Sequence, residues 1–255
     1  MPASPLTPVF GAASACADCA HRADLLTAGR CQPGDACVRA HSGRQIDRFL
    51  ARNPELAAGY LDDAFWERRA IAARYAPRDA VRALARDPDE VVRRAVADRL
   101  PPEELLALLA DPDREVRVTV ALRLPLEALP ALLADPDYLV RQVVARRLPH
   151  GRLARLAADP EPEVRKEVAR RLPAFALQKL AADPDPEVRR IAAARMLPDG
   201  AAALLADADW RVRLEAARRA PVAALAALLD DVEECVREIA RERIIPTAKT
   251  KDAYP

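Results

Sequence analysis

The residues best suited to chemistry are four cysteines near the N-terminus. Their spacing is C-x₂-C, then eleven residues, then C-x₅-C, at Cys16, Cys19, Cys31 and Cys37. In a cytosolic chain, where disulfides are uncommon, clustered cysteines indicate a metal site before they indicate disulfides. Four thiolates could hold one structural zinc ion or an iron–sulfur cluster. The spacing leaves both open, because the second pair lacks the C-x₂-C form that would favour zinc.

Other groups near these cysteines bear on the site. His21 and His41 could ligate in place of a cysteine, although four cysteines already complete a site. Three neighbouring arginines could offset thiolate charge around either metal, namely Arg22, Arg30 and Arg39. The alternative is four unligated thiols packed in a small cap. The fifth cysteine, Cys235, stands alone inside the last helix and is expected to be a core residue.

Behind the cysteines the chain repeats itself every 24 residues. A weak first copy opens at Asp63, and clearer copies open at Asp87, Asp111, Asp135, Asp159, Asp183, Asp207 and Asp231. Self-similarity at such a period is the signature of a solenoid. Alternation of β-branched and aromatic residues is nearly absent. The sequence therefore predicts an all-α repeat fold.

One repeat contains the signals for a helix and a shorter second element. Asp87-Pro88 has the residue types of an N-cap and a first helical position, and apolar residues recur at i, i+4 and i+8 from Val92. Pro101 should end this helix. Leu105 and Leu108 then fit either a short α-helix or a 3₁₀ turn.

Neighbouring repeats must stack to bury their apolar faces. Three sets of equivalent residues should form this core. The first is a leucine ladder of Leu84, Leu108, Leu132, Leu156, Leu180, Leu204 and Leu228. The second stands at the helix ends, at Leu100, Leu124, Leu148, Leu172 and Met196. The third predicts close helix approach through Ala97, Ala121, Ala145, Ala169, Ala193 and Ala217.

We divide the chain into a Cys-rich domain and N-terminal cap at residues 1–62, about eight repeats at 63–246, and a flexible tail at 247–255. Residues 1–15 lack the basic and apolar segments of a secretory signal. No run of 18 apolar residues occurs, so no transmembrane helix is expected. A cytoplasmic location is the expectation.

The repeat form DPxxxVRxxVAxRLPxxxLxxL resembles the leucine-rich repeat variant family, and the four-cysteine segment looks like that family's iron–sulfur domain. The resemblance implies a right-handed superhelix of alternating α- and 3₁₀-helices. It also implies a [4Fe–4S] cluster with Cys16, Cys19, Cys31 and Cys37 as ligands. Such proteins occur in nitrogen-fixing bacteria, and their biochemical role is not established. The first copy departs from the pattern, with Arg68 in place of valine and Tyr75 in place of the second arginine.

Two arginines recur in the repeats. One set lies on the packed side of its helix and predicts a structural ladder with Asp89 or with Asp87 of a neighbouring repeat, since a buried charge needs a partner. This set includes Arg93, Arg117, Arg141, Arg165 and Arg189. The other set runs from Arg99 through Arg123, Arg147, Arg171, Arg195 and Arg219 to Arg243. Variable positions are expected to be exposed and to form a possible binding surface, at Arg94, Gln142, Lys166 and Arg190.

The composition and the motifs favour some functions over others. Lys+Arg number 40 and Asp+Glu 39, so the chain lacks the basic excess of most nucleic-acid-binding domains. Three scattered histidines, His21, His41 and His150, offer no nucleophile–base pair, and no phosphate-binding glycine loop occurs, so no enzyme activity is expected. The leading hypothesis is a scaffold for a macromolecular partner, protein rather than nucleic acid, in which the metal centre caps, senses redox state or relays electrons. The alternative is a redox-responsive nucleic-acid-binding protein that uses the arginine ladders.

Overall fold

The computed structural model describes residues 16–245, and their regular elements are all helical. Within that range the only extended pairing is an isolated bridge between Gln32 and Ala36. The all-α prediction is therefore confirmed. The predicted tail at 247–255 and the segment 1–15 lie outside the described residues. The chain divides into two compact units, Met1–Pro125 and Leu126–Pro255.

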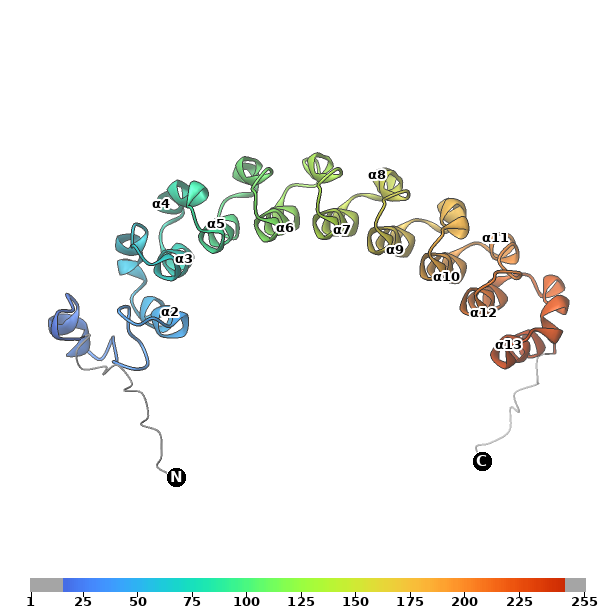
Figure 1. The fold of residues 1–255 in the computed structure, drawn as a ribbon, viewed down its shortest axis with the longest axis horizontal. Helices are drawn as coiled ribbons and strands as arrows, with labels where there is room; N and C mark the ends of the chain where they lie inside the picture. The colour runs from blue at the N-terminus through green and yellow to red at the C-terminus, as the bar shows by residue number, and fades with distance from the viewer. Residues whose placement is uncertain (1–15, 246–255) are drawn as a thin grey trace, which may run out of the picture. The chain divides into compact units, whose positions relative to one another are not determined.

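In the first unit the long helices pack side by side, and short helical turns form a second layer against them (Figure 1). The long helices are α2 (Gly43–Arg52), α3 (Trp66–Tyr75), α5 (Glu90–Ala97) and α6 (Arg114–Arg123). The short elements are the π-helical turn η1 (Arg22–Leu26), the α-turn α4 (Arg78–Val81), and the 3₁₀ segments η2 (Pro54–Tyr60), η3 (Arg82–Arg86) and η4 (Pro102–Leu108).

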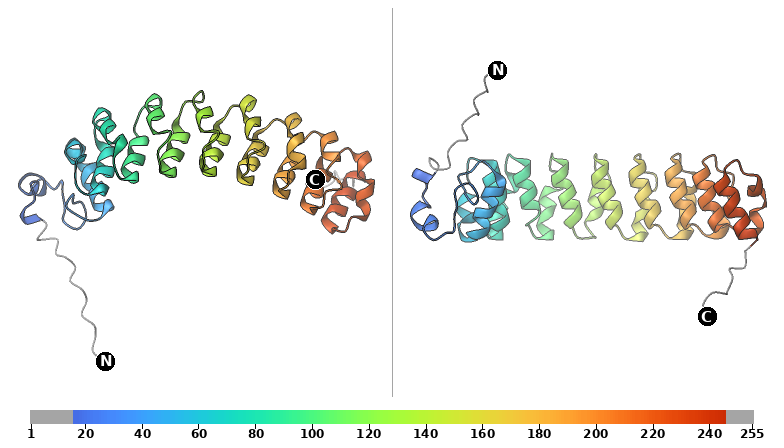
Figure 2. Two further views of the ribbon diagram at one scale, coloured as in Figure 1. Left: turned by 45° about the horizontal axis from the view of Figure 1, so that its top comes forward. Right: turned by 90° about the horizontal axis from the view of Figure 1, so that it is seen from below.

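The second unit repeats this arrangement (Figure 2). Its long helices are α7 (Tyr138–Arg147), α9 (Pro162–Arg171), α10 (Pro186–Arg195), α12 (Trp210–Arg219) and α13 (Glu234–Ile244). Its 3₁₀ segments are η5 (Leu129–Leu132), η6 (Ala154–Leu156), η7 (Ala174–Ala182), η8 (Val222–Ala224) and η9 (Ala226–Asp230), with short α-turns α8 (His150–Leu153) and α11 (Pro198–Ala202). The alternation of α- and 3₁₀-helices implied by the family resemblance is confirmed.

The predicted core ladders are buried in every copy. The leucine ladder keeps at most 7% exposure, and the alanine ladder keeps none. Because alanine has the smallest apolar side chain, adjacent long helices can approach closely along that row. A further buried row is formed by Leu105, Leu129, Leu153, Leu177, Ala201 and Leu225, all fully covered. This row is the inner side of the 3₁₀ layer.

The long helices begin two residues later than the sequence signals predicted. The N-cap is Asp89, whose carboxylate accepts from the Val91 amide at 2.9 Å, and not Asp87. The equivalent third residues Asp113, Asp137, Asp185 and Asp209 cap their helices in the same way. The prediction was wrong because Asp87 is occupied by another interaction, so the next competent acceptor in the chain takes over the cap.

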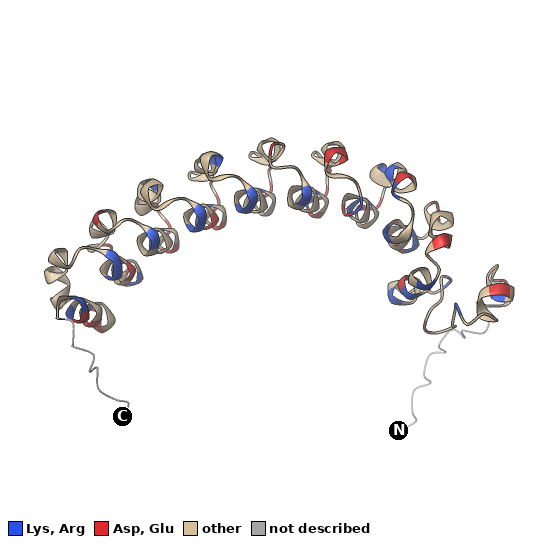
Figure 3. Ribbon diagram, turned by 180° about the vertical axis from the view of Figure 1, so that it is seen from behind, with Lys and Arg blue, Asp and Glu red and all other residues tan. Residues whose placement is uncertain are grey.

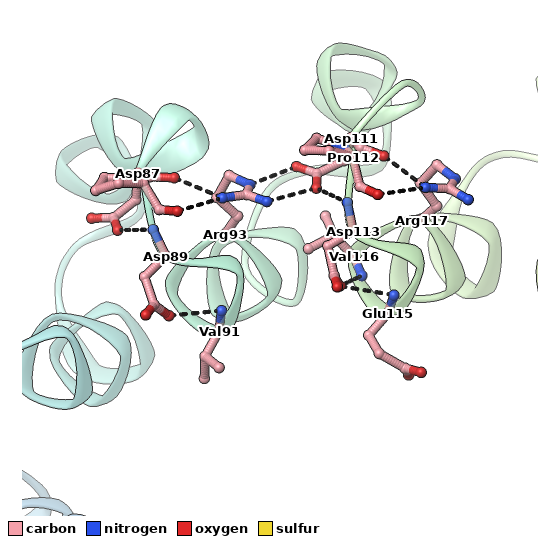
Figure 4. A network of polar contacts seen from close by, with 11 residues as sticks. Asp87, Asp89, Val91, Arg93, Asp111, Pro112, Asp113, Glu115, Val116 and Arg117 are labelled. Carbon is pink, nitrogen blue, oxygen red and sulfur yellow. Dashed lines mark hydrogen bonds and ion pairs between the residues drawn. The ribbon is translucent and has the colours of Figure 1, made fainter.

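That interaction is an arginine fork between repeats (Figure 4). Arg93 donates through Nε and Nη2 to both carboxylate oxygens of Asp111, at 2.7 and 2.9 Å. Its Nη1 donates to the carbonyls of Asp87 and Pro88 at 2.8 and 3.2 Å. Asp111 also accepts from the Asp113 amide. The same fork joins Arg69 to Asp87, Arg141 to Asp159, Arg165 to Asp183, Arg189 to Asp207 and Arg213 to Asp231.

The predicted Asp–Arg ladder is therefore confirmed for these pairs, with the first aspartate of the next repeat as partner and not Asp89. Arg93 and Asp111 are 9% and 7% exposed, so both charges are nearly desolvated. A buried ion pair offsets its desolvation only when its geometry is good and the remaining donors are satisfied. The bidentate fork with two carbonyl acceptors meets that condition.

The second arginine set points in the opposite direction along the stack. Arg99 donates to the Ala76 carbonyl at 3.0 Å, and Arg219 to the Met196 carbonyl at 3.0 Å. Arg243 donates to the carbonyls of Ala217 and Ala220 at 2.6 Å. These carbonyls belong to the end of the preceding long helix, where they lack intrahelical donors. Each such arginine thus caps the helix of the repeat before it.

The terminal repeats depart from the pattern at the residues that would meet a further repeat. At the C-terminal end, Arg241 occupies the position of the alanine ladder and is half exposed. Arg237 pairs with Glu234 of its own helix. The last described copy is thus a repeat that carries a charged side chain at the position of the alanine ladder.

Replacing Leu132 by alanine should destabilise the second unit by about 2–5 kcal/mol, because its buried side chain would leave a cavity between repeats. Urea unfolding followed by circular dichroism measures this loss. Leu197→Ala is the control, since Leu197 is 53% exposed and its loss should stay within about 0.5 kcal/mol. Equal effects of the two substitutions would contradict the assignment of Leu132 to the core.

The fork predicts a dependence of stability on pH. The Arg189 hydrogen bond lowers the pKa of Asp207 below its ordinary value. A carboxyl whose pKa is depressed by folding stabilises the folded state above its unfolded pKa, about 3.9. This contribution is lost as pH falls from about 4 through the lower folded pKa.

Asp207→Asn should cost about 3 kcal/mol at pH 7, because it leaves the largely buried Arg189 charge without its carboxylate partner. The gap between variant and wild type should close below pH 4 as Asp207 becomes protonated. Urea unfolding across this pH range measures it, with the exposed Glu127→Gln as control. A gap that stays constant down to pH 2 would contradict the fork as its source.

Candidate metal centre and helix-face surface

The four N-terminal cysteines line one pocket at the start of the first unit. Arg22, Leu26, Phe49 and Val38 line it as well. None of the five cysteines in the described part of the chain forms a disulfide. The structure therefore brings together the whole sulfur set that the sequence singled out, at Cys16, Cys19, Cys31 and Cys37.

Each pair of cysteines is held by local backbone structure. The Cys19 amide donates to the Cys16 carbonyl at 3.3 Å, which closes a tight turn between the first two thiols. Before Cys31 the chain turns at Gly29, which has φ +68°, a conformation that side chains with a Cβ rarely adopt. The Cys31 amide then donates to the Leu25 carbonyl at 3.2 Å.

The second pair is mounted on helix α2. The Cys37 amide donates to the carbonyl of Gln45, in the first turn of α2, at 3.1 Å. Asp35, between the two cysteines, forms ion pairs with Arg48 and Arg52 of the same helix. At the other end of α2, Asn53 donates to the carbonyl of Arg30 at 3.0 Å. Both ends of the Cys31–Cys37 segment are thus fixed to one helix.

The charge balance of the pocket suits a cationic centre. Burial raises the pKa of the Cys31 thiol, and the charges of Cys19, Cys16 and Cys37 raise it further. Four mutually repelling sulfurs are poor thiolates by themselves, whereas a bound metal replaces their protons. The donor set therefore fits a thiolate-ligated metal or iron–sulfur cluster. Among residues 16–245, no three His, Cys, Asp or Glu side chains are close enough to hold a single metal ion.

The histidines that were considered as alternative ligands are engaged elsewhere. His21 is hydrogen-bonded to the Tyr60 hydroxyl and packs on the Phe49 ring, with centroids 5.4 Å apart. His41 packs on Phe65 at 5.5 Å. Burial and the Cys19 charge raise the pKa of Tyr60 to about 12. Tyr60 thus stays protonated and can donate to His21, whose ring packs on Phe49 of the pocket lining.

The lone Cys235 packs against the apolar cluster of the last repeat, as expected of a core residue. The helix-face positions proposed as a binding surface differ in exposure. Arg94 is exposed as predicted, whereas the Lys166 side chain is only 15% exposed and donates to Glu163 at 2.7 Å. Exposure of Lys166 was a wrong expectation, and its ammonium group is held by Glu163 of the same helix.

Gln142 is half-buried, and Arg190 is bonded to Glu187 at 2.6 Å and approaches Glu215 of α12 at 3.7 Å. Lys and Arg recur on the long helices of both units (Figure 3). In the second unit they are interleaved with carboxylates, as in Arg146 with Glu167 at 3.5 Å. In the second unit, the charged side chains of the long helices therefore form a network of ion pairs between neighbouring helices.

Sequence reasoning missed Asn53 and Tyr60, and it predicted for Arg30 only a role in charge compensation. The pair Asn53-Pro54 has the residue types that end a helix, which does not single out Asn53 as a contact of the pocket. One signal was available, since Asn53 is the sole asparagine of the 255 residues. Its partners are main-chain carbonyls, which no residue pattern reveals. Separately, no helix within residues 16–245 is both long and apolar enough to cross a lipid bilayer.

Comparison with known proteins agrees with this architecture. A family model described as the LRV protein FeS4 cluster matches residues 10–59. The leucine rich repeat variant model matches four copies, at residues 66–89, 91–113, 114–137 and 162–185.

A solved structure described as a leucine-rich repeat variant with a novel repetitive structural motif is 54% identical, with a TM-score of 0.87. The alignment covers 93% of this chain and all of that one. An uncharacterized 27.7 kDa protein in the nifB 3′ region of Rhodobacter capsulatus is 41% identical over 91 residues. That match spans 36% of this chain and 37% of the relative's length. The chain belongs to the leucine rich repeat variant family, with the family's FeS4-cluster domain ahead of its repeats.

Proposed function

We propose that the chain holds a [4Fe–4S] cluster on Cys16, Cys19, Cys31 and Cys37 and that its repeats form a scaffold for a protein partner. The observation that carries the first part is the convergence of all four thiols on one pocket, inside the segment that matches the FeS4-cluster model. Four cysteine thiolates are the complete ligand set of such a cluster. One structural zinc ion is the alternative occupant.

A cluster with a full set of thiolates suits electron storage or sensing, which needs no open iron. Hydrogen bonds, net charge and solvent exposure set the potential of such a centre. Arg22 lines the pocket and supplies positive charge beside the thiolates. The apolar wall of Leu26, Val38 and Phe49 limits water. When bound, the cluster would supply one-electron chemistry, and these residues would set how readily it occurs.

The state of the arginines favours a protein partner over a nucleic acid. The ladder guanidiniums are buried and already donate to carboxylates and carbonyls. A phosphate backbone could reach them only if the forks between repeats opened. The exposed Arg146, Arg170 and Arg218 of the second unit lie beside carboxylates, which would repel phosphates. A face of interleaved charges is better suited to a protein surface with complementary charges.

Protein purified without oxygen should contain about four irons and four acid-labile sulfides per chain, by the cluster type assigned above. Cys31→Ser should lose the cluster, because one of four ligands is removed. Metal and sulfide analysis with optical and EPR spectra measures both, and Cys235→Ser is the matched control outside the pocket. One zinc and no sulfide in the wild type would overturn the cluster assignment.

Mixed-sequence duplex DNA should show no complex tighter than about 1 μM at physiological salt, the range of non-specific binding. Gel-shift titration over a range of salt concentrations measures it. Tight binding with a steep salt slope, reduced by about one unit in Arg94→Ala, would contradict the protein-partner proposal and favour the nucleic-acid alternative. Arg93 is unsuitable for this comparison, since its loss would break a fork.

A further inference from the structure

We propose that Asn53 is a positioning residue that holds the Cys31 turn on the end of α2 and thereby couples the metal centre to the first repeats. This inference rests on the proposed cluster site but concerns a residue outside the ligand set. Asn53 follows α2 directly and is completely buried. It lies between the turn that presents Cys31 and the helix that carries Phe49, a wall of the pocket.

The Asn53 amide is used entirely as a donor. Its Nδ2 donates to the Arg30 carbonyl at 3.0 Å and to the Phe49 carbonyl at 2.7 Å. The orientation of the amide follows from chemistry, because both neighbours are carbonyls that can only accept. One bond satisfies a free carbonyl at the C-terminus of α2. The other reaches the residue immediately before Cys31.

The rest of the side chain shows that this arrangement has a cost. The Oδ1 atom is buried and accepts no hydrogen bond from any described residue. A buried acceptor without a partner is destabilising, and in a native structure it calls for an explanation. Capping of α2 alone does not explain the buried Oδ1 atom, because an exposed helix end can be satisfied by water without a buried amide. The bond to Arg30 does explain it, because only a side chain with two donors can join two carbonyls.

The Arg30 side chain provides a second connection between the Cys31 turn and α2. It donates to the Arg52 carbonyl of α2 at 3.1 Å and pairs with Glu55 of η2. Asn53 thus holds the main chain of the turn, while Arg30 holds it from the surface. Groups of this kind, which orient ligands without touching the metal, typically change metal affinity by about 10–100-fold when removed.

Helix α2 in turn contacts the first repeat. Glu67 of α3 packs on Gly43 so closely that a Cβ at position 43 would clash with its carboxylate. Tyr75 of α3 donates to Asp47 of α2 at 3.0 Å. Movement of the Cys31 turn is therefore linked through Asn53 and α2 to α3.

Iron release to a chelator from the anaerobically purified full chain tests the proposal. Asn53→Ala should release iron about 10–100-fold faster than wild type. Leu84→Ala is the control, because Leu84 is buried in the same unit but lies outside the pocket, and its rate should stay within about twofold. An unchanged rate in Asn53→Ala, or equal acceleration in both variants, would overturn the proposal.

Two further measurements cover the remaining cases. Arg30→Ala removes the half-exposed Arg30 side chain and leaves no buried cavity. It should accelerate iron release by a smaller factor than Asn53→Ala. Hydrogen exchange of residues 28–37 in metal-free protein should speed up in Asn53→Ala and not in Leu84→Ala. If the wild type holds no iron and sulfide, the cluster proposal fails, but the proposed role of Asn53 is still tested by hydrogen exchange. Unchanged exchange would still overturn the role of Asn53.

Discussion

The fork between an arginine and the first aspartate of the next repeat is the constraint on which the repeat fold depends. One aspartate serves three partners at once. The carboxylate of Asp111 accepts hydrogen bonds from the Arg93 guanidinium and from the Asp113 amide. The Asp111 carbonyl accepts a further bond from Arg117. A buried charge tolerates little displacement from its partner. The fork therefore fixes the spacing and register of successive repeats, which the apolar ladders alone would leave adjustable.

The two arginine sets divide this task by direction. The first, as in Arg93, binds the carboxylate that lies 18 residues ahead. The second, as in Arg219, binds the carbonyls at the end of the helix behind it. Each repeat is thus joined to the next repeat by an ion pair and to the preceding repeat by a helix cap. Both arginines of a repeat are used inside the stack, in bonds to neighbouring repeats.

The sequence predicted the fold class, the period, the core ladders and the Asp–Arg ladder, because each depends on residue types at a fixed spacing. It misplaced the helix start, since Asp87 and Asp89 are both good caps and only the fork from Arg69 of the preceding repeat decides between them. It misjudged the exposure of Lys166, because helical periodicity identifies a face but not which neighbouring helix covers it. The four cysteines were visible, whereas their supports involve main-chain carbonyls, namely those that accept from the Asn53 side chain and that of Gln45.

The cysteine segment and α2 take the place of a repeat that lacks the fork. Gln45 stands 24 residues before Arg69, where an arginine would be expected. Asp63 accordingly receives no fork from a preceding repeat, and Arg68 pairs with it from within its own helix at 3.2 Å.

Other contacts hold α2 to the stack, namely the fit of Glu67 on Gly43 and the bond from Tyr75 to Asp47. These contacts lie partly exposed, unlike the buried forks. The thiol segment adds its bonds at both ends of the same helix, through Gln45 and Asn53. Where the chain lacks the ion pair between repeats, the cysteine segment is therefore the element best placed to secure the first helix. If the proposed cluster binds these thiols, the strength of this cap depends on the cluster, which would link the chemistry of the cysteines to the stability of the first repeats.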